Sequence, residues 1–137
     1  MLTLCNVKTH TNNRKNFSFE NNQTIDISGT HLTAIPALID PHVHFRTPGA
    51  EHKENWISGA KAALSGGVTT VFDMPNNTPS CTSLERLDDK IQQIESQLKK
   101  ANIPLRYHLY FGAHKNCISQ LEKVKDKVYS RDINNKD

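Results

Sequence analysis

Two histidines separated by a single residue, His42 and His44, follow the apolar run 34–40 (AIPALID). Side chains two positions apart on an extended strand point the same way, so both imidazoles can face one point. Zinc binds imidazole nitrogens at about 2.0–2.1 Å, and Asp40, which has the same parity, could support a histidine ligand. A His-x-His pair is most often a coincidence, but parallel sheets place their sites just after a strand. The pattern leaves a metal site and a chance pairing equally open.

Arg46 and the loop 74–79 (MPNNTP) hold groups that could bind an anion beside such an ion. Arg46 stands two positions after His44, so it continues the two-residue spacing of the histidines beyond the strand. The Asn76 amide offers both a hydrogen-bond donor and an acceptor. By itself the loop is a plain Asn-Pro turn. If the two preceding strands are neighbours, Arg46 and Asn76 leave the sheet at one rim, where a guanidinium and an amide together could hold a carboxylate.

These side chains need a scaffold, and the sequence predicts one in which strands and helices alternate. The predicted strands, which are apolar and β-branched, are 34–40, 68–74 and 104–111. The predicted helices run from His52 to the glycine pair 66–67, from Thr82 to Ala101, and more weakly over Cys117, Leu121 and Val124. Strand–helix alternation of this kind predicts an α/β fold with a parallel sheet.

The long helix is the clearest element of the sequence. Thr82 and Glu85 have the spacing of a capping box. Apolar residues then repeat every three or four positions along one stripe: Leu84, Leu87, Ile91, Ile94 and Leu98.

The two ends of the chain differ from this pattern. Residues 1–33 are rich in Asn and Thr, and strand-like alternation is limited to 17–20 and 24–28, so this segment needs partner strands from elsewhere. Residues 129–137 are almost wholly polar and are predicted to be a disordered tail. Three strand–helix units cannot close a barrel, which takes eight units and roughly 250 residues. Either the fold is a small open sheet or, as we expect, the chain is a piece of a larger protein.

Composition and charge exclude several classes of protein. Lys and Arg number 17 against 14 Asp and Glu, but they are scattered and form no basic stripe, so no nucleic-acid partner is predicted. Three distant cysteines, Cys5, Cys81 and Cys117, predict neither disulfides nor a zinc knuckle. No signal peptide or membrane-spanning run is recognised. The expected protein is soluble and cytoplasmic, with no membrane partner.

Two stretches, IDPHVHFRTPGAEHKENW (39–56) and GAKAALSGGVTTVFDMPNNTP (59–79), resemble the dihydroorotases of the amidohydrolase superfamily. The similarity runs from about Pro36 to Gly112. The His-x-His element alone is shared with hydantoinases, allantoinases and deacetylases. The HFR-x-PG string and the MPN-x-x-P loop are typical of dihydroorotases and narrow the resemblance to them.

The resemblance implies that His42 and His44 are ligands of one or two zinc ions. It also implies that Arg46 and Asn76 bind the carboxylate of the substrate, with Asp40 in a supporting position near the metal. The reaction would be the reversible cyclisation of N-carbamoyl-L-aspartate to dihydroorotate in pyrimidine biosynthesis.

The implied fold is a metal-dependent (β/α)8 TIM barrel, with 34–128 as its first three βα units and 1–33 as part of a small β-sandwich domain. The further metal ligands and the general base would lie beyond the C-terminus, so no catalytic residue is expected in this chain, and the chain alone is expected to be inactive. A homo-oligomer or a transcarbamoylase partner is expected of a full-length protein. Two alternatives stay open: another cyclic amidohydrolase of the allantoinase or hydantoinase type, and a non-catalytic homologue that serves as a partner subunit.

The remaining titratable and aromatic residues receive structural interpretations. Asp73 is expected to form a structural pair within the barrel, and Trp56 to lie in the core or an interface. The other histidines are not expected to bind metal: His10, His31, His52, His108 and His114. Asp88 and Asp89 are expected on the solvated face of the long helix.

Overall fold

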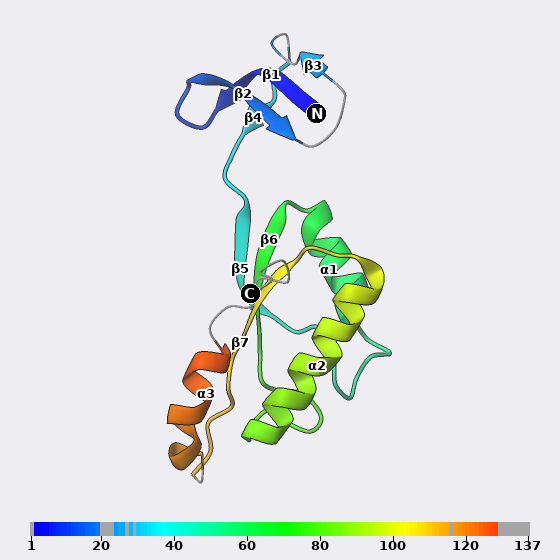
Figure 1. The fold of residues 1–137 in the computed structure, drawn as a ribbon, viewed down its shortest axis with the longest axis vertical. Coiled ribbons are helices and arrows are strands. Elements are labelled where there is room, and N and C mark those ends of the chain that lie inside the picture. Colours follow the sequence, from blue (N-terminus) through cyan, green and yellow to red (C-terminus); the bar gives the residue numbers. More distant parts are fainter. Residues whose placement is uncertain (1, 20–23, 27, 29, 116, 129–137) are drawn as a thin grey trace. The chain divides into compact units, whose positions relative to one another are not determined.

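The computed structural model describes residues 2–19, 24–26, 28, 30–115 and 117–128 (Figure 1). The chain divides into two compact units, Met1–Pro36 and Ala37–Asp137. The expected boundary after residue 33 is close to this division. The tail predicted at 129–137 lies outside the described residues.

The first unit is a small sheet made of β1 (Leu2–Thr9), β2 (Arg14–Phe19), β3 (Thr24–Asp26) and β4 (Thr33–Ala34). Strand β1 pairs with β2 in antiparallel fashion and with β3 and β4 in parallel fashion. A register shift interrupts the pairing of β1 with β2 between Leu4 and Val7, and Asn6 there has φ 56°. Such an irregularity breaks period-two alternation. For this reason the sequence pattern indicated β2 and β3 but missed β1.

The second unit holds the predicted alternation of parallel strands and helices. Its sheet has the order β5 (Leu38–Val43), β6 (Val68–Asp73) and β7 (Arg106–Leu109), all parallel. Its helices are α1 (Trp56–Ser65), α2 (Leu84–Ala101), the short 3₁₀ turn η1 (Ile118–Gln120) and α3 (Leu121–Val128). Helices α1 and α2 pack against each other (Figure 1). Because β5 and β6 are paired in parallel, their C-terminal ends lie side by side, as the hypothesis of a shared carboxylate-binding rim requires.

Trp56 and the apolar stripe of α2 form the core of the second unit. The Trp56 side chain is fully buried, and its ring meets Phe45 and Tyr107 edge to face at centroid distances of 4.8 and 5.3 Å. The prediction that Trp56 lies in the core is therefore confirmed. Four members of the predicted stripe are also buried: Leu87, Ile91, Ile94 and Leu98.

Helix α1 begins at Trp56, so the predicted start at His52 is wrong. The side chain of Asn55 accepts hydrogen bonds from the backbone N–H groups of Ile57 and Ser58, at 2.9 and 3.0 Å. An asparagine in this position satisfies donors that have no partner inside the first turn of a helix. The residues before it form turns instead of helix.

Helix α2 begins at Leu84, and the predicted capping box of Thr82 and Glu85 is also wrong. Ser83 is the N-cap residue, and its hydroxyl accepts from the backbone N–H of Arg86 at 3.3 Å. The capping-box spacing favoured Thr82, because Glu85 follows it by three positions, whereas the structure uses the adjacent Ser83, which is followed at that spacing by Arg86.

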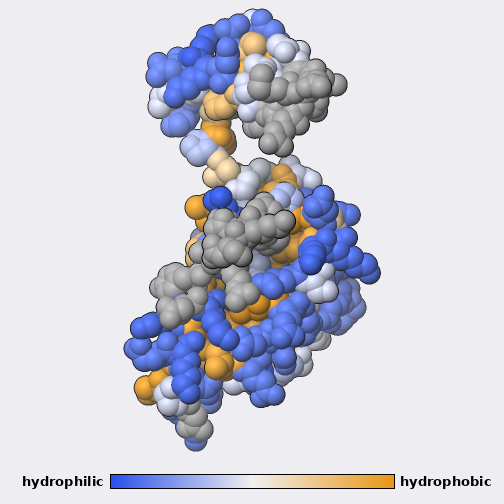
Figure 2. All heavy atoms as spheres, in the orientation of Figure 1, coloured by the Kyte–Doolittle hydropathy of each residue, from blue (hydrophilic) through white to orange (hydrophobic). Residues whose placement is uncertain are grey.

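The prediction of a buried strand at 34–40 is wrong in position and in burial. The strand is β5, and its first residues Leu38 and Ile39 are 46% and 62% exposed. The reason is that β5 is an edge strand of the three-stranded sheet. Figure 2 shows apolar surface on this unit among the hydrophilic residues. In the weakly predicted helix over Cys117, Leu121 and Val124, Leu121 is exposed, whereas Cys117 and Val124 are buried.

Candidate metal and carboxylate site

The two histidines of the His-x-His element present their Nε2 atoms to each other at the end of β5. His42 lies within the strand and His44 just after it, and the two Nε2 atoms are 3.2 Å apart. Two nitrogens bound to one tetrahedral zinc ion at 2.0–2.1 Å would be separated by about 3.3 Å. The observed separation therefore fits two neighbouring positions around a zinc ion. No group of three or more His, Cys, Asp or Glu residues that could hold a metal occurs in the described part of the chain.

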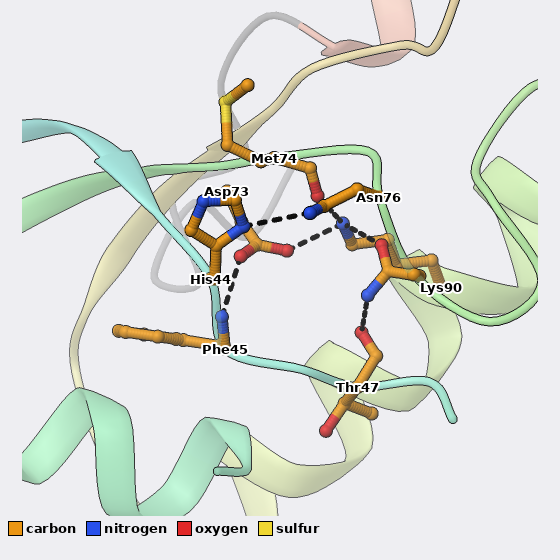
Figure 3. Close-up of polar contacts among 8 residues, drawn as sticks. His44, Phe45, Thr47, Asp73, Met74, Asn76 and Lys90 are labelled. Atoms are coloured by element: carbon orange, nitrogen blue, oxygen red, sulfur yellow. Dashed lines mark hydrogen bonds and ion pairs between the residues drawn. The ribbon is translucent and has the colours of Figure 1, made fainter. Parts of the chain in front are cut away.

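The ring of His44 is oriented by Asn76. His44 Nδ1 lies 2.8 Å from Asn76 Oδ1 (Figure 3). An amide oxygen only accepts hydrogen bonds, so this contact places the imidazole proton on Nδ1 and leaves the lone pair on Nε2. That is the tautomer a metal requires on the side that faces His42. Contacts of this kind fix the orientation of metal-binding histidines.

Asp40 contacts the main chain beside the imidazoles. Its Oδ1 accepts from the backbone N–H of His42 at 3.0 Å. The Asp40 carboxylate therefore holds the backbone of His42. The imidazole ring of His44 is contacted by Asn76. The expected supporting role of Asp40 near a metal stays a prediction.

Arg46 sits at the centre of a tight turn that follows β5. Its φ angle is 61°, and the backbone N–H of Thr47 donates to the carbonyl of Phe45 at 2.8 Å. This three-residue γ-turn with positive φ is uncommon and strained for a residue with a side chain. The Arg46 side chain is half-buried. The turn directs the chain away from the strand at the residue expected to bind substrate.

Arg46, Asn76 and His44 line one pocket of about 140 Å³. The pocket also includes Lys53, whose ammonium adds a second positive charge to its lining. His42 and Asp40 are not among the lining residues. The structure thus brings together three of the residues singled out in the sequence, one from the end of β5 and two from the loops after β5 and β6.

The two loops that form this pocket approach each other closely at Gly49. The backbone N–H of Thr78 donates to the carbonyl of Pro48 at 3.2 Å. Gly49 has φ 98°, and a Cβ atom added to it would lie 2.0 Å from the carbonyl oxygen of Thr78. Only glycine fits this position, which accounts for the Pro-Gly part of the HFR-x-PG string.

A buried charged network joins two residues of the pocket lining, Asp73 and Asn77, to Lys90 of α2 (Figure 3). Asp73, the last residue of β6, accepts from the Phe45 backbone N–H at 2.8 Å and pairs with Lys90 of α2 at 2.6 Å. Lys90 also donates to Asn77 Oδ1 at 2.8 Å, and the Asn77 amide donates to the carbonyl of Thr47 at 2.9 Å. The expected structural pairing of Asp73 is therefore observed.

Sequence reasoning missed Lys90 and Asn77. Lys90 follows Leu87 by three positions and precedes Ile94 by four, so it lies on the apolar stripe of α2. A lysine in such a stripe is a signal of a buried charge with a partner, because an unpaired ammonium is costly to bury.

The remaining candidates lie where the sequence placed them. His10, His31, His52 and His114 are exposed, and His108 stacks on Phe72 at a centroid distance of 4.4 Å. Asp89 is exposed, while Asp88 forms a partly exposed ion pair with Lys127 at 2.6 Å. Burial raises the pKa of the Cys81 thiol.

Comparison with known proteins identifies the class to which this fold and site belong. The sequence model of the amidohydrolase family matches residues 33–134. This range is more than half of the 137 residues, and the chain belongs to the amidohydrolase family.

Within the family, the chain is similar to dihydroorotases. It is 54% identical over 56 residues to the dihydroorotase of Halobacterium salinarum, covering 41% of this chain and 13% of that protein. It is 40% identical over 102 residues to the dihydroorotase of Methanosarcina mazei, covering 74% and 20%. The multifunctional protein CAD of Squalus acanthias is 42% identical over 105 residues, 76% of this chain and 4% of that protein. The matches thus span a fifth or less of each of these relatives.

Solved structures confirm the predicted fold class. The chain superposes on the L-hydantoinase of Arthrobacter aurescens with a TM-score of 0.72 at 19% identity, covering 92% of this chain and 31% of that one. For the D-hydantoinase of Thermus sp. the TM-score is 0.63 at 23% identity, covering 90% and 31%. The second unit therefore has the fold of βα units from an amidohydrolase (β/α)8 barrel. Among the described residues, no helix is long and apolar enough to span a bilayer.

Proposed function

We propose that this chain carries the metal-binding histidines and the carboxylate-binding residues of a dihydroorotase. The substrates would be the small molecules dihydroorotate and N-carbamoyl-L-aspartate, interconverted by hydrolysis or closure of a cyclic amide. The observation that carries the proposal is a single pocket lined by His44, Arg46 and Asn76, in which Asn76 Oδ1 contacts the imidazole of His44. The similarity to named dihydroorotases over the same residues supports it.

The metal proposed is zinc, in one or two ions, held in part by Nε2 of His42 and of His44. When bound, zinc polarises an amide carbonyl and lowers the pKa of a bound water. The residues of this chain would prepare that chemistry. Asn76 keeps the Nδ1 proton on His44, so that Nε2 faces the ion. Asp40 holds the His42 backbone in place.

Arg46 would bind the substrate carboxylate and thereby orient the ring toward the metal. A guanidinium matches a carboxylate with two parallel hydrogen bonds, and its charge makes these bonds stronger than neutral ones. Such positioning lowers the barrier by fixing the reacting atoms in place, without a proton transfer by the arginine itself. Lys53 adds positive charge to the same pocket, which favours an anionic substrate over a neutral ring.

A chimera tests this proposal in a complete enzyme. The 102-residue segment of this chain that aligns with the Methanosarcina mazei dihydroorotase would replace its counterpart in that protein. We expect the chimera to hydrolyse dihydroorotate. Arg46→Met in the chimera should lower kcat/KM by about 10²–10³-fold, or about 3–4 kcal/mol, because a charged hydrogen-bond partner of the substrate is lost. Steady-state kinetics at several dihydroorotate concentrations measures the effect.

Arg86→Met is the matched control, because Arg86 is an exposed arginine of α2 and does not line the pocket. It should leave kcat/KM within about twofold, in keeping with the small effects of most surface substitutions. A chimera that hydrolyses hydantoin or dihydrouracil but not dihydroorotate would replace the proposal with the hydantoinase-type alternative. An Arg46→Met chimera with unchanged turnover of dihydroorotate would refute the role of Arg46.

Zinc binding by the chimera provides a second, graded test that needs no turnover. His44→Ala removes a ligand, whereas Asn76→Ala removes only the partner of its ring, which typically costs roughly 10–100-fold in metal affinity. We therefore expect the loss of zinc affinity in a chelator competition titration to be largest for His44→Ala, smaller for Asn76→Ala and absent for the exposed control His52→Ala. Equal affinity in all three variants would exclude His44 as a ligand.

A further inference from the structure

We infer that Lys90 is the positioning residue of the pocket: the buried Asp73–Lys90–Asn77 network holds the main chain on both sides of Arg46 and of Asn76. The expected effect of Lys90 on substrate binding rests on the proposed function. The restraint that the network places on the main chain does not depend on that function. Lys90 lies on α2, away from the pocket lining, and would act only through the residues it contacts.

The contacts of Lys90 use its full hydrogen-bonding capacity. Its Nζ lies 2.6 Å from Asp73 Oδ2, 2.8 Å from Asn77 Oδ1 and 3.1 Å from the carbonyl of Met74. An ammonium has three donors, so all are occupied. The Lys90 and Asp73 side chains are 0% and 1% exposed, and at that burial each charge depends on the other.

The network reaches the Arg46 turn from both ends. Asp73 Oδ1 accepts from the N–H of Phe45, the residue before Arg46, at 2.8 Å. The Asn77 amide donates to the carbonyl of Thr47, the residue after it, at 2.9 Å. The γ-turn between them is strained, and such a conformation persists only where the surroundings hold it. The network supplies these two restraints.

The same lysine holds the loop that carries Asn76. Met74 and Asn77, which stand on either side of Pro75 and Asn76, both accept hydrogen bonds from Lys90. Lys90 thus contacts the loop after β6 directly, and it reaches the loop after β5 only through Asp73 and Asn77. A buried ion pair is weak evidence for stability, because apolar residues of similar volume often replace it without loss. Its geometry here accounts for precise placement of two pocket residues.

The experiment compares Lys90→Met, the double variant Asp73→Asn/Lys90→Met, and the control Lys99→Met, an exposed lysine on the same helix. The double variant avoids an unpaired buried carboxylate, and its asparagine can still accept from Phe45. Amide hydrogen exchange of the full 137-residue chain, followed by NMR, gives the first readout. We expect the protection of the Thr47 N–H to fall by about tenfold or more relative to that of Ile94 in both variants, and to be unchanged in Lys99→Met.

The second readout is the kinetics of the same variants in the chimera. Loss of positioning should raise KM for dihydroorotate by about tenfold or more and change kcat less, because the carboxylate pocket is loosened while the imidazoles remain. Three outcomes would overturn the inference and assign the network to general stability. The protection of the Thr47 N–H could stay as it is, it could fall only as much as that of Ile94, or both variants could fail to fold. A chimera inactive on dihydroorotate would contradict the proposed function alone, since the exchange result does not depend on turnover.

Discussion

At the scale of single residues, the turn at Arg46 rests on the packing of its neighbour Phe45. The Phe45 ring packs against the first turn of α1, where it meets the Trp56 ring edge to face and lies next to Gly59. A Cβ atom added to Gly59 would lie 2.8 Å from Cδ1 of that ring. This is closer than any relaxed carbon contact, so a larger residue there must displace Phe45.

Gly59→Ala sets two opposing effects against each other. Alanine stabilises a helix interior by about 1 kcal/mol over glycine, whereas overpacking a core typically costs about 1–3 kcal/mol. Since the neighbour is a buried ring that also packs edge to face with Trp56, we expect overpacking to dominate, with a net loss of up to about 2 kcal/mol in urea unfolding of the full chain.

Gly66→Ala is the matched control at the end of the same helix. Its added Cβ would meet nothing closer than 3.5 Å, and its φ of −87° is accessible to alanine. We expect no loss of stability there. A Gly59→Ala protein as stable as Gly66→Ala would show that Phe45 can move at no cost.

At the scale of elements, local capping chemistry decides where each helix of the second unit begins. The apolar periodicity of α1 is compatible with a start at His52, but the side chain of Asn55 accepts from two backbone N–H groups of the first turn. The segment before it is thereby freed for the turns that bring Lys53 to the pocket.

Asn55→Ala should therefore destabilise the chain by about 0.5–2 kcal/mol, and Asn55→Asp should retain most of the stability, because aspartate caps equally well. His52→Ala, at the start predicted from the sequence, should change stability by less than about 0.5 kcal/mol. Thermal unfolding followed by circular dichroism measures all three variants. If His52→Ala lost as much stability as Asn55→Ala, the result would favour a helix that begins at His52.

At the scale of the whole molecule, β5 is an edge of the three-stranded sheet and carries exposed apolar side chains. In the structure β5 and β7 are both edges, and the large exposed side chains of the strands are Leu38 and Ile39 of β5. An unpaired apolar edge of this kind promotes pairing with other chains.

Ile39→Lys should reduce self-association, because a charge on an edge strand opposes pairing with a second edge. We expect the fraction of oligomer in sedimentation velocity at fixed protein concentration to fall severalfold. Ile39→Val preserves the apolar edge and should leave the distribution unchanged. Equal oligomer content in both variants would indicate that association uses another surface.

The sequence by itself determined the alternation of strands and helices, the core stripe of α2, and which candidate site residues stand at the ends of the strands. These features depend on local periodicity and on the two-residue repeat of a strand, and both are written in the order of residues. The resemblance to dihydroorotases rests on the same contiguous stretches, and for that reason the family could be recognised before the fold was known.

Only the tertiary structure decided how those residues are held. Lys90 and Asp73 are 17 positions apart in sequence, and their pairing depends on how α2 packs beside β6. The contact between His44 and Asn76, the turn at Arg46 and the exposure of β5 likewise depend on which strands are neighbours. Such contacts join distant segments and follow from packing of the whole unit, which no local pattern of residues records.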